Sequence, residues 1–152
     1  MSHTVLDGIE QVRAAVGRHL GYSDWVQVTQ EQVDLFADAT GDHQWIHVDP
    51  PRARSGPFGG PIAHGYLTLS LSNQLLPQVV EVRGFSLGVN YGTNKVRFPA
   101  PVPVDAHVRA GVELAAVDDV AGGVQTTMLI TMEIRNSDKP ACVIEALSRY
   151  VV

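Results

Sequence analysis

The second half of the chain alternates apolar and polar residues with the period of a β-strand. Turn-forming residues interrupt the alternation at 118–123 and at 136–138. Turns of this hairpin type join neighbouring antiparallel strands. We therefore expect a mostly antiparallel sheet. Its long strands are 85–91, which residues 94–98 could prolong, 106–114, 124–134 and 142–152.

A different pattern, without any charged face, occupies residues 56–80. His64 is the only side chain there that can carry a charge near neutral pH, and leucines surround most of a helical circumference between Pro61 and Pro77. A helix with no charged side has no face to show to water, so other structure should enclose it. The run is too short for a membrane span, and it contains Ser, Thr, Asn and Gln. We expect a buried helix over 63–76.

The simplest packing of these two patterns is a sheet that curls around the apolar helix. The small residues Gly88 and Gly92 would let the sheet and the helix approach closely. The other face of the sheet still carries apolar side chains, which indicates a partner subunit. No linker or repeat divides the sequence, so we predict one α+β domain over residues 1–152.

The first third of the chain predicts two further helices. Apolar residues at positions 5, 9, 12 and 16 recur at helical spacing, which predicts an amphipathic helix over about 4–17 that ends near Gly17. A short alternating strand follows at 24–28. Thr29 then begins a capping-box pattern for a second helix, and Gly41 suits the C-terminal cap of that helix.

The charge balance excludes several classes of partner. Eleven Lys and Arg against sixteen Asp and Glu give a net charge of −5, which would not attract nucleic-acid phosphates or anionic lipid surfaces. Hydrophobic residues make up 45% of the chain, enough for a sizeable core. The single cysteine, Cys142, fits a reducing compartment, and the first residues lack the order of a signal peptide. We expect a cytoplasmic location.

The first candidates for chemistry are Asp42 and His47, five residues apart just past the second predicted helix. A carboxylate and an imidazole on one tight loop can share a water, take a proton from it and deliver a proton elsewhere. The alternative is structural: Asp42 makes an Asx-turn after the helix, and His47 is a hydrogen-bonded loop residue. The residue types alone favour the structural alternative.

A metal site needs separate consideration, because His43 and His47 stand four residues apart and are flanked by Asp42 and Asp49. On a helix, this spacing would place both rings on one face. Gly41 behind and Pro50 ahead argue against a helix here, and no further ligand set is evident. We therefore predict no metal.

His64 and Gly65 stand at the expected start of the buried helix. The first turn of a helix presents unpaired N–H groups and the positive end of the helix dipole. Gly65 has no side chain to block a ligand, so its N–H could stabilise an enolate-like oxyanion. The alternative, which the residues alone favour, is that Gly65 permits close packing and His64 satisfies a buried hydrogen bond.

Other side chains are candidates for binding a substrate. Basic residues could hold a phosphorylated ligand, aromatic residues could line an apolar tunnel, and two polar positions on the buried helix could face a pocket. Solvated charges, core packing and internal hydrogen bonds explain the same residues. The candidates are Lys95, Arg97, Arg52 and Arg54, then Trp45, Phe58 and Tyr66, and finally Asn73 and Gln74. Walker and dinucleotide motifs are absent from the sequence, which argues against a nucleotide enzyme.

Two motifs in this order resemble one known family. Residues 39–50, Ala-Thr-Gly-Asp-His-Gln-Trp-Ile-His-Val-Asp-Pro, resemble the hydratase 2 motif of MaoC-like, (R)-specific enoyl-CoA hydratases. Residues 61–66, Pro-Ile-Ala-His-Gly-Tyr, are similar to that family's second signature, and residues 95–102 to its following strand. The resemblance extends from about Asp24 to the C-terminus. It raises the catalytic interpretation of the Asp–His pair above the structural one.

The resemblance implies a hotdog fold, in which a five-stranded antiparallel sheet wraps a long helix and two subunits pair their sheets. It implies reversible hydration of trans-2-enoyl-CoA to (R)-3-hydroxyacyl-CoA, without metal or organic cofactor. Asp42 and His47 match the family's catalytic pair, and Gly65 matches the glycine whose N–H forms the oxyanion hole. The implied substrate is an acyl-CoA thioester, and the implied assembly is a homodimer.

The chain departs from the family pattern at Gln44 and Trp45, where relatives usually have Asn-Pro. In relatives that Asn helps to orient the water, so Gln44 could replace it with a longer arm or point elsewhere. Trp45 could reshape the acyl pocket, so the departure affects substrate preference more than reaction type. We expect substrate contacts from His64, Gln44, Trp45, Tyr66, Asn73, Lys95 and Arg97.

Two rival functions stay open. Thioesterases and acyl-carrier-protein dehydratases of this fold commonly place a carboxylate on the central helix, whereas residues 63–76 contain neither Asp nor Glu. A carrier-protein thioester is still an alternative substrate, because the reacting group is the same. The second rival, a non-catalytic acyl-binding subunit of a larger dehydratase, would need no Asp–His pair.

Overall fold

The alternating stretches of the sequence pair into one antiparallel sheet in the computed structural model, which describes residues 3–152. The long strands of this sheet are β5 (Leu87–Arg97), β6 (His107–Val120), β7 (Gly123–Ile134) and β8 (Cys142–Val151). The strand order is β2-β6-β7-β8-β5, and β2 (His19–Tyr22) shares the edge beside β6 with β3 (Val26–Gln27). The expected helix and mostly antiparallel sheet are confirmed.

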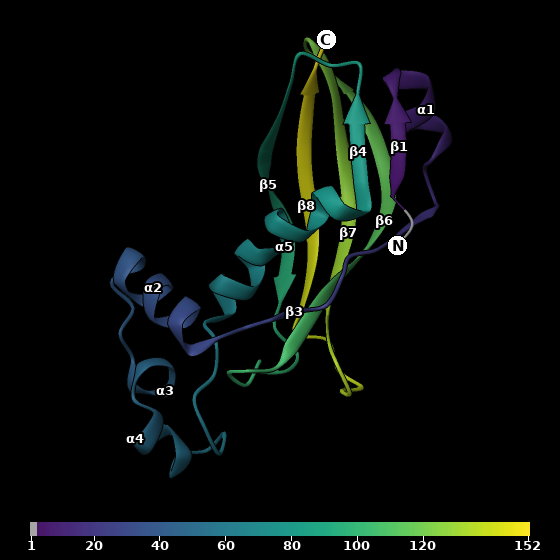
Figure 1. Cartoon of the computed structure of the whole chain (residues 1–152). Helices are drawn as coiled ribbons and strands as arrows, with labels where there is room; N and C mark the ends of the chain where they lie inside the picture. The colour runs from purple at the N-terminus through teal and green to yellow at the C-terminus, as the bar shows by residue number, and fades with distance from the viewer. Residues whose placement is uncertain (1–2) are drawn as a thin grey trace.

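The inward face of this sheet supplies most of the core. Val112 of β6 pairs with Ile130 of β7, which pairs in turn with Ile144 of β8, and all three side chains are buried. Cross-strand contacts between branched side chains stabilise a sheet, and their burial on one face fixes its register. The sheet is bent around the helix α5, which crosses its concave side (Figure 1).

α5 (Gly65–Val79) is the central helix that the sequence predicts, and it contacts β2, β6, β7 and β8. Its inner face is apolar at four-residue spacing, so the same side of the helix meets the sheet along its whole length. The buried side chains on this face are Leu67, Leu71, Leu75 and Val79.

α5 differs from the prediction in two ways. It continues past Pro77 to Val79, because a proline in the last turn removes only one intrahelical hydrogen bond and Val79 is packed in the core. The expected full enclosure is wrong for a single chain, since the sheet covers only one side of the helix. The exposed residues of the outer face are Tyr66, Ser70, Asn73, Gln74 and Pro77. Within residues 3–152, no helix is long and apolar enough to cross a membrane.

The single N-terminal helix predicted over 4–17 is wrong. Thr4–Asp7 forms β1, which pairs in parallel with β4 (Val80–Arg83), and α1 covers only Gly8–Ala14. Gly8 has a φ of +81°, so the backbone leaves the strand sharply before the helix begins. Pairing with β4 satisfies the backbone groups of β1, and that long-range partner is not visible in the local pattern.

The expected role of Gly88 and Gly92 is also wrong. A Cβ added at Gly88 would lie 2.9 Å from the Tyr150 ring of β8, and one added at Gly92 would meet nothing within 4 Å. Gly111 of β6 resembles Gly88, because a Cβ there would lie 2.8 Å from the Tyr22 ring. Glycine at 88 and 111 therefore makes room for aromatic rings on neighbouring strands, and not for α5.

α2 (Gln30–Thr40) begins and ends where the sequence predicts. The Thr29 hydroxyl accepts a hydrogen bond from the Gln32 N–H at 3.2 Å, which caps the first turn. At the other end, Gly41 adopts the left-handed conformation with a φ of +81°, and its N–H donates to the carbonyl of Ala37 at 2.8 Å. The helix thus ends at a glycine inside the first motif, and Asp42 follows directly.

The absence of helix expected between Gly41 and Pro50 is wrong, because a single turn, α3 (Trp45–Val48), lies there. One turn fits, since the glycine and the proline flank it and do not interrupt it. α4 (Pro50–Arg54) follows directly, with the Asp49 side chain accepting from its first turn. These short helices lie below α2 and away from the sheet (Figure 1).

We expect Leu75→Ala to lower the free energy of unfolding by about 2–5 kcal/mol, because the Leu75 side chain is fully buried between α5 and the sheet. Leu35→Ala is the matched control, since Leu35 is 63% exposed on α2. The control should change stability by less than about 0.5 kcal/mol. Urea denaturation followed by circular dichroism measures both, and equal losses would contradict the placement of α5 in the core.

Candidate active site

Asp42 follows the C-terminal cap of α2 and starts the turn into α3. Its Oδ1 accepts from the backbone N–H of Gln44 at 3.4 Å, and its own N–H donates to the Thr40 hydroxyl at 3.4 Å. Both contacts are long, so the Asx-turn of the structural interpretation is present in a weak form. The side chain of Asp42 stays exposed, which leaves its carboxylate accessible to a ligand.

His47 lies in α3 and is only 6% exposed. Its Nδ1 is 2.7 Å from the backbone carbonyl oxygen of Ile62, which can only accept, so Nδ1 carries the hydrogen. In the neutral ring, Nε2 is then an acceptor, as a general base requires. The side-chain amide of Gln30, at the start of α2, donates to the His47 carbonyl at 2.8 Å. Both the ring and the backbone of His47 are therefore held.

Burial lowers the pKa of His47 below its ordinary value of 6.5. The carbonyl of Ile62 and the carboxylate of Asp42 oppose this shift, and the imidazole of His64 adds to it. The lowered pKa keeps His47 neutral at physiological pH, so its Nε2 is available to accept a proton.

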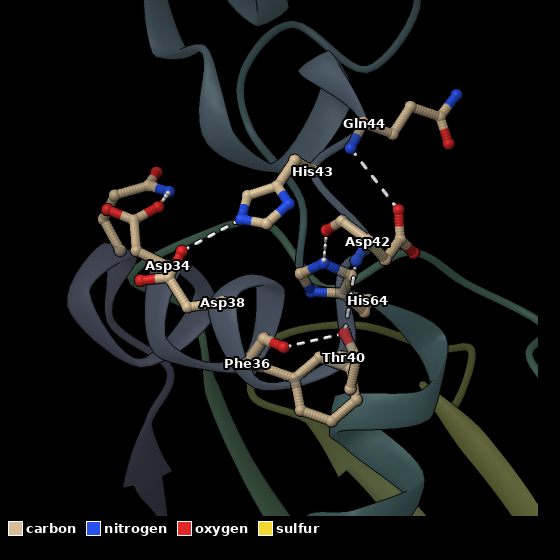
Figure 2. A network of polar contacts seen from close by, with 9 residues as sticks. Asp34, Phe36, Asp38, Thr40, Asp42, His43, Gln44 and His64 are labelled. Atoms are coloured by element: carbon tan, nitrogen blue, oxygen red, sulfur yellow. Dashed lines mark hydrogen bonds and ion pairs between the residues drawn. The ribbon is translucent and has the colours of Figure 1, made fainter.

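His64, the residue before α5, joins Asp42 and His47. Its Nε2 donates to the backbone carbonyl of Asp42 at 2.9 Å (Figure 2). Its ring stacks on that of His47, with centroids 3.9 Å apart and planes 23° from parallel. One polar side-chain atom from each of the three residues lies within 4.8 Å of the other two. Residues far apart in the sequence thus form one cluster.

The geometry of this cluster favours hydrogen bonding over metal binding. Imidazole nitrogens bind a metal in the plane of the ring, and the stacked planes of His47 and His64 run side by side. The other ligands that the spacing suggested have different partners: His43 pairs with Asp38 of α2 at 2.9 Å, and Asp49 accepts from the first turn of α4. The hydrogen bond to Asp38 raises the pKa of His43. Figure 2 shows His43 turned toward Asp38.

Two cavities meet at His47 and Gly65, which line both. We call the larger one, of about 310 Å³, the apolar cavity, and the smaller one, of about 250 Å³, the Asp–His cavity. The other residues of the apolar cavity are Phe58, Ile62, Ala63, Thr68, Phe98, Ala100, Pro101, Val102 and Ala141. Those of the Asp–His cavity are Phe36, Thr40, Asp42, His64 and Tyr66.

Gly65 is the first residue of α5, so its N–H belongs to the first turn, whose amides have no acceptor within the helix. A Cβ added at Gly65 would lie 3.2 Å from the ring of Phe98, which follows β5. Both interpretations of Gly65 therefore hold in part. The glycine permits close packing of Phe98, and its backbone is open to the two cavities.

The aromatic candidates divide between the cavities. Phe58 lines the apolar cavity and Tyr66 lines the Asp–His cavity. Trp45 lines neither, because its ring lies under the guanidinium of Arg52, 4.4 Å from the ring centroid, and against Gly56. Trp45 thus shapes the α3–α4 segment from outside the cavities.

Four other predicted substrate contacts lie outside both cavities. The side chain of Gln44 extends away from His64, and only its backbone meets Asp42 (Figure 2). Asn73 lies two turns further along α5, in a separate groove of about 250 Å³ beside β5. Lys95 and Arg97 are exposed on β5. These contacts stay predictions from the sequence.

Several residues that build the site were not expected from the sequence. The carbonyl of Ile62 fixes the hydrogen on His47, but every residue carries a carbonyl, so no sequence signal marks this one. Phe36 and Thr40 line the Asp–His cavity from the last turns of α2. Phe98 had a signal, since it stands at the end of a strand that the resemblance covers, next to a proline that ends it.

The chain is similar to a known protein family and to named relatives. A model of the MaoC like domain matches residues 11–134. The chain is 56% identical over 146 residues to 3-hydroxyacyl-thioester dehydratase Z of Mycobacterium tuberculosis (strain ATCC 25618 / H37Rv), which covers 95% of this chain and 97% of the relative. It is 34% identical over 101 residues to (R)-specific enoyl-CoA hydratase of Aeromonas caviae, which covers 66% of this chain and 72% of the relative.

A solved structure agrees in fold. The MaoC-like dehydratase from Rhodospirillum rubrum superposes with a TM-score of 0.73 at 21% identity, over 90% of this chain and 92% of the other. A long helix inside a curved antiparallel sheet defines the hotdog class of proteins. Within that class, the chain belongs to the MaoC-like domain family.

We expect the ring of His47 to titrate below pH 6.5 and that of His43 above it, because burial lowers one pKa and the Asp38 carboxylate raises the other. Nitrogen-15 NMR of the imidazoles, recorded against pH, measures both values and also shows which ring nitrogen carries the hydrogen. Asp38→Asn is the control, since it should lower the pKa of His43 and leave His47 unchanged. A His47 ring that titrates above 6.5, or carries its hydrogen on Nε2, would disprove the assignment.

Proposed function

We propose that this chain hydrates trans-2-enoyl-CoA to (R)-3-hydroxyacyl-CoA and catalyses the reverse dehydration. The observation that carries the proposal is the approach of the Asp42 carboxylate and the His47 ring to within 4.8 Å, in a cavity that Gly65 also lines. That separation suits one water bonded to both groups. The names of the two curated relatives, a hydroxyacyl-thioester dehydratase and an enoyl-CoA hydratase, support this reaction type.

The proposed mechanism uses that one water. Its oxygen adds to C3 of the enoyl thioester while a hydrogen leaves it for Nε2 of His47, the acceptor nitrogen of the neutral ring. The Asp42 carboxylate holds the other hydrogen of the water and orients its oxygen. The protonated His47 then delivers this proton from Nε2 to C2 on the same side, so that H and OH from one water add across the double bond and the Asp–His pair returns to its starting state.

The charge that develops during this addition lies on the thioester oxygen. Attack at C3 pushes electrons toward the carbonyl and gives it enolate character. The N–H of Gly65 points from the first turn of α5, where the dipole of a 15-residue helix also favours negative charge. We therefore assign to Gly65 the hydrogen bond to the thioester oxygen, which strengthens as the reaction proceeds.

The apolar cavity is the proposed site of the acyl chain. His47 is the only ionisable side chain that lines it, and its lowered pKa keeps it neutral. It lies where this cavity meets the Asp–His cavity. Hydrocarbon binding there removes apolar surface from water, which favours binding at about 25 cal/mol per Å². A chain that ends in this cavity places its thioester near Gly65, and the CoA arm would then leave past the exposed Tyr66.

Lys95 and Arg97 are the proposed contacts for the phosphates of CoA. Both are exposed on β5, and this strand leads directly to Phe98 beside Gly65. Within residues 3–152, the guanidinium of Arg97 bonds only to the neighbouring carbonyl of Val96 at 2.8 Å, so it can turn toward an anion. The whole chain has a net charge of −5, and these two residues would supply positive charge at the mouth of the site.

A second copy of the chain is the partner that we propose. β5 ends the sheet, and in the described part of the chain its outer edge has no neighbouring strand. Leu87, Val89 and Tyr91 on this strand are between 42% and 55% exposed. Antiparallel pairing of two β5 edges would satisfy their backbone groups and continue one sheet across both subunits. The side-chain oxygen of Asn73 accepts a hydrogen bond from Asn90 of β5 at 3.4 Å, and the groove beside it would then lie against the partner.

The alternative function is dehydration of a hydroxyacyl group on a carrier protein. The name of the Mycobacterium tuberculosis relative specifies a thioester and not CoA, which is the observation that favours this alternative. Both substrates present the same enoyl or hydroxyacyl thioester to Asp42 and His47. Parallel assays with crotonyl-CoA and a crotonyl carrier protein distinguish the two, because only the carrier would be preferred under the alternative.

We expect Asp42→Asn and His47→Gln each to lower kcat for crotonyl-CoA hydration by about 10²- to 10⁴-fold, because each removes one of the two groups on the water. Loss of the enoyl absorbance measures turnover, and circular dichroism checks that both variants fold. His43→Gln is the matched control, because His43 lies next to Asp42 but pairs with Asp38 on the surface. Near-normal turnover in both site variants would refute the mechanism.

We expect kcat/KM to be lost as the pH falls through the pKa of His47, and therefore only below pH 6.5. Acid protonates Nε2 and removes the base, and the lowered pKa moves this loss to lower pH than for an ordinary histidine. His43→Gln should leave the acid limb where it is, although the pKa of His43 is raised. An acid limb centred above pH 6.5 that moves in this variant would contradict the role of His47.

A further inference from the structure

His64 contacts both of the residues that the proposed reaction needs. It is 2% exposed, at the N-terminal cap of α5. One face of its ring stacks on His47 at 3.9 Å, and its Nε2 donates to the backbone carbonyl of Asp42 at 2.9 Å (Figure 2). The ring of Phe36 packs against it at 4.9 Å. A single buried ring therefore touches both the base and the residue that carries the carboxylate.

The hydrogen-bond partner of His64 fixes which ring nitrogen donates. A carbonyl oxygen only accepts, so Nε2 must carry a hydrogen. Nδ1 is buried and has no hydrogen-bond partner within residues 3–152. The N–H at Nε2 therefore donates the hydrogen bond through which His64 contacts the Asp42 turn.

The turn that holds Asp42 has weak restraints apart from His64. The contacts of Asp42 with Thr40 and Gln44 are both 3.4 Å long, whereas the bond from His64 is 2.9 Å. Asp42 is on the surface, while His64 is packed at the end of the core helix. A displacement of about 1 Å in catalytic geometry can cost on the order of 10²-fold in rate. The bond from His64 is thus the contact that ties the carboxylate to the rigid part of the molecule.

We propose that His64 is a positioning residue, which sets the separation between the Asp42 carboxylate and the His47 ring through its Nε2–H bond to the Asp42 carbonyl. The proposal rests on the proposed hydration. It differs from the substrate contact that the sequence predicts for His64, because the bond and the two ring contacts are all made to the protein.

Three substitutions separate the hydrogen bond of His64 from its ring. His64→Gln places an amide N–H near the position of Nε2 and removes the ring. His64→Phe keeps a ring for the stack and removes the donor. His64→Asn is polar like Gln, but its shorter side chain reaches only the position of Nδ1. The variants His64→Gln and His64→Asn therefore differ mainly in whether the side-chain N–H reaches the backbone carbonyl of Asp42.

We expect His64→Phe and His64→Asn to lower kcat for crotonyl-CoA hydration by about 10- to 100-fold, with KM changed by less than about threefold. His64→Gln should rescue kcat to within about threefold of the parent protein. Thermal unfolding of each variant, followed by circular dichroism, reports on folding separately. If the Phe variant does not fold, the comparison of Gln with Asn still decides the matter.

A double-variant cycle tests whether His64 acts through Asp42. In the Asp42→Asn background, His64→Phe should change the residual kcat by less than about threefold, because the carboxylate that it positions is gone. A loss as large as in the parent protein would mean that His64 acts independently of Asp42 and would overturn the proposal.

Other outcomes also overturn it. A parental kcat in both His64→Phe and His64→Asn would show that the bond is not needed, and equal losses in Gln and Asn would assign the effect to the ring. A raised KM with unchanged kcat would make His64 a substrate contact. Full activity of Asp42→Asn itself would instead refute the proposed function, so the two failures are distinguishable.

Discussion

The packing of α5 inside the curved sheet is the constraint on which the site depends. Leu75, in the C-terminal half of the helix, is fully buried, and a close-packed interior does not let such a helix slide without opening voids. The first residue of α5, Gly65, is therefore held at a fixed place between the apolar cavity and the Asp–His cavity. Its free amide comes from a helix terminus supported by the core, which is more rigid than a loop.

Contacts with the protein hold His47 more firmly than Asp42. His47 is fixed at its ring by the Ile62 carbonyl and at its backbone by Gln30, so both the position and the tautomer of its imidazole are set by the protein. Asp42 stands on an exposed turn and depends on the single short bond from His64. An accessible carboxylate beside a buried, neutral imidazole suits a water that must enter, react and be replaced.

The hydrophobic pattern of the sequence could predict the elements whose burial is visible in neighbouring residues. Alternation along 124–134 and the absence of charge over 63–76 are local signals of burial, so β7 lies where the sequence places it and the central helix is present, although α5 ends later than expected. β1 could not be predicted, because its strand character depends on pairing with β4, more than seventy residues away. A carbonyl partner such as that of Ile62 carries no signal in residue type. The acyl-chain preference, the homodimer and the cytoplasmic location remain predictions.

The central claim is that one water, held on one side of the substrate by Asp42 and His47, supplies both added atoms. Hydration of crotonyl-CoA in D₂O tests it most directly, with the configuration at C2 and C3 of the product determined by proton NMR and chiral analysis. The account predicts (R) configuration at C3 and a single diastereomer in which deuterium and hydroxyl have added to the same face. Addition to opposite faces, or a mixture at C2, would contradict it.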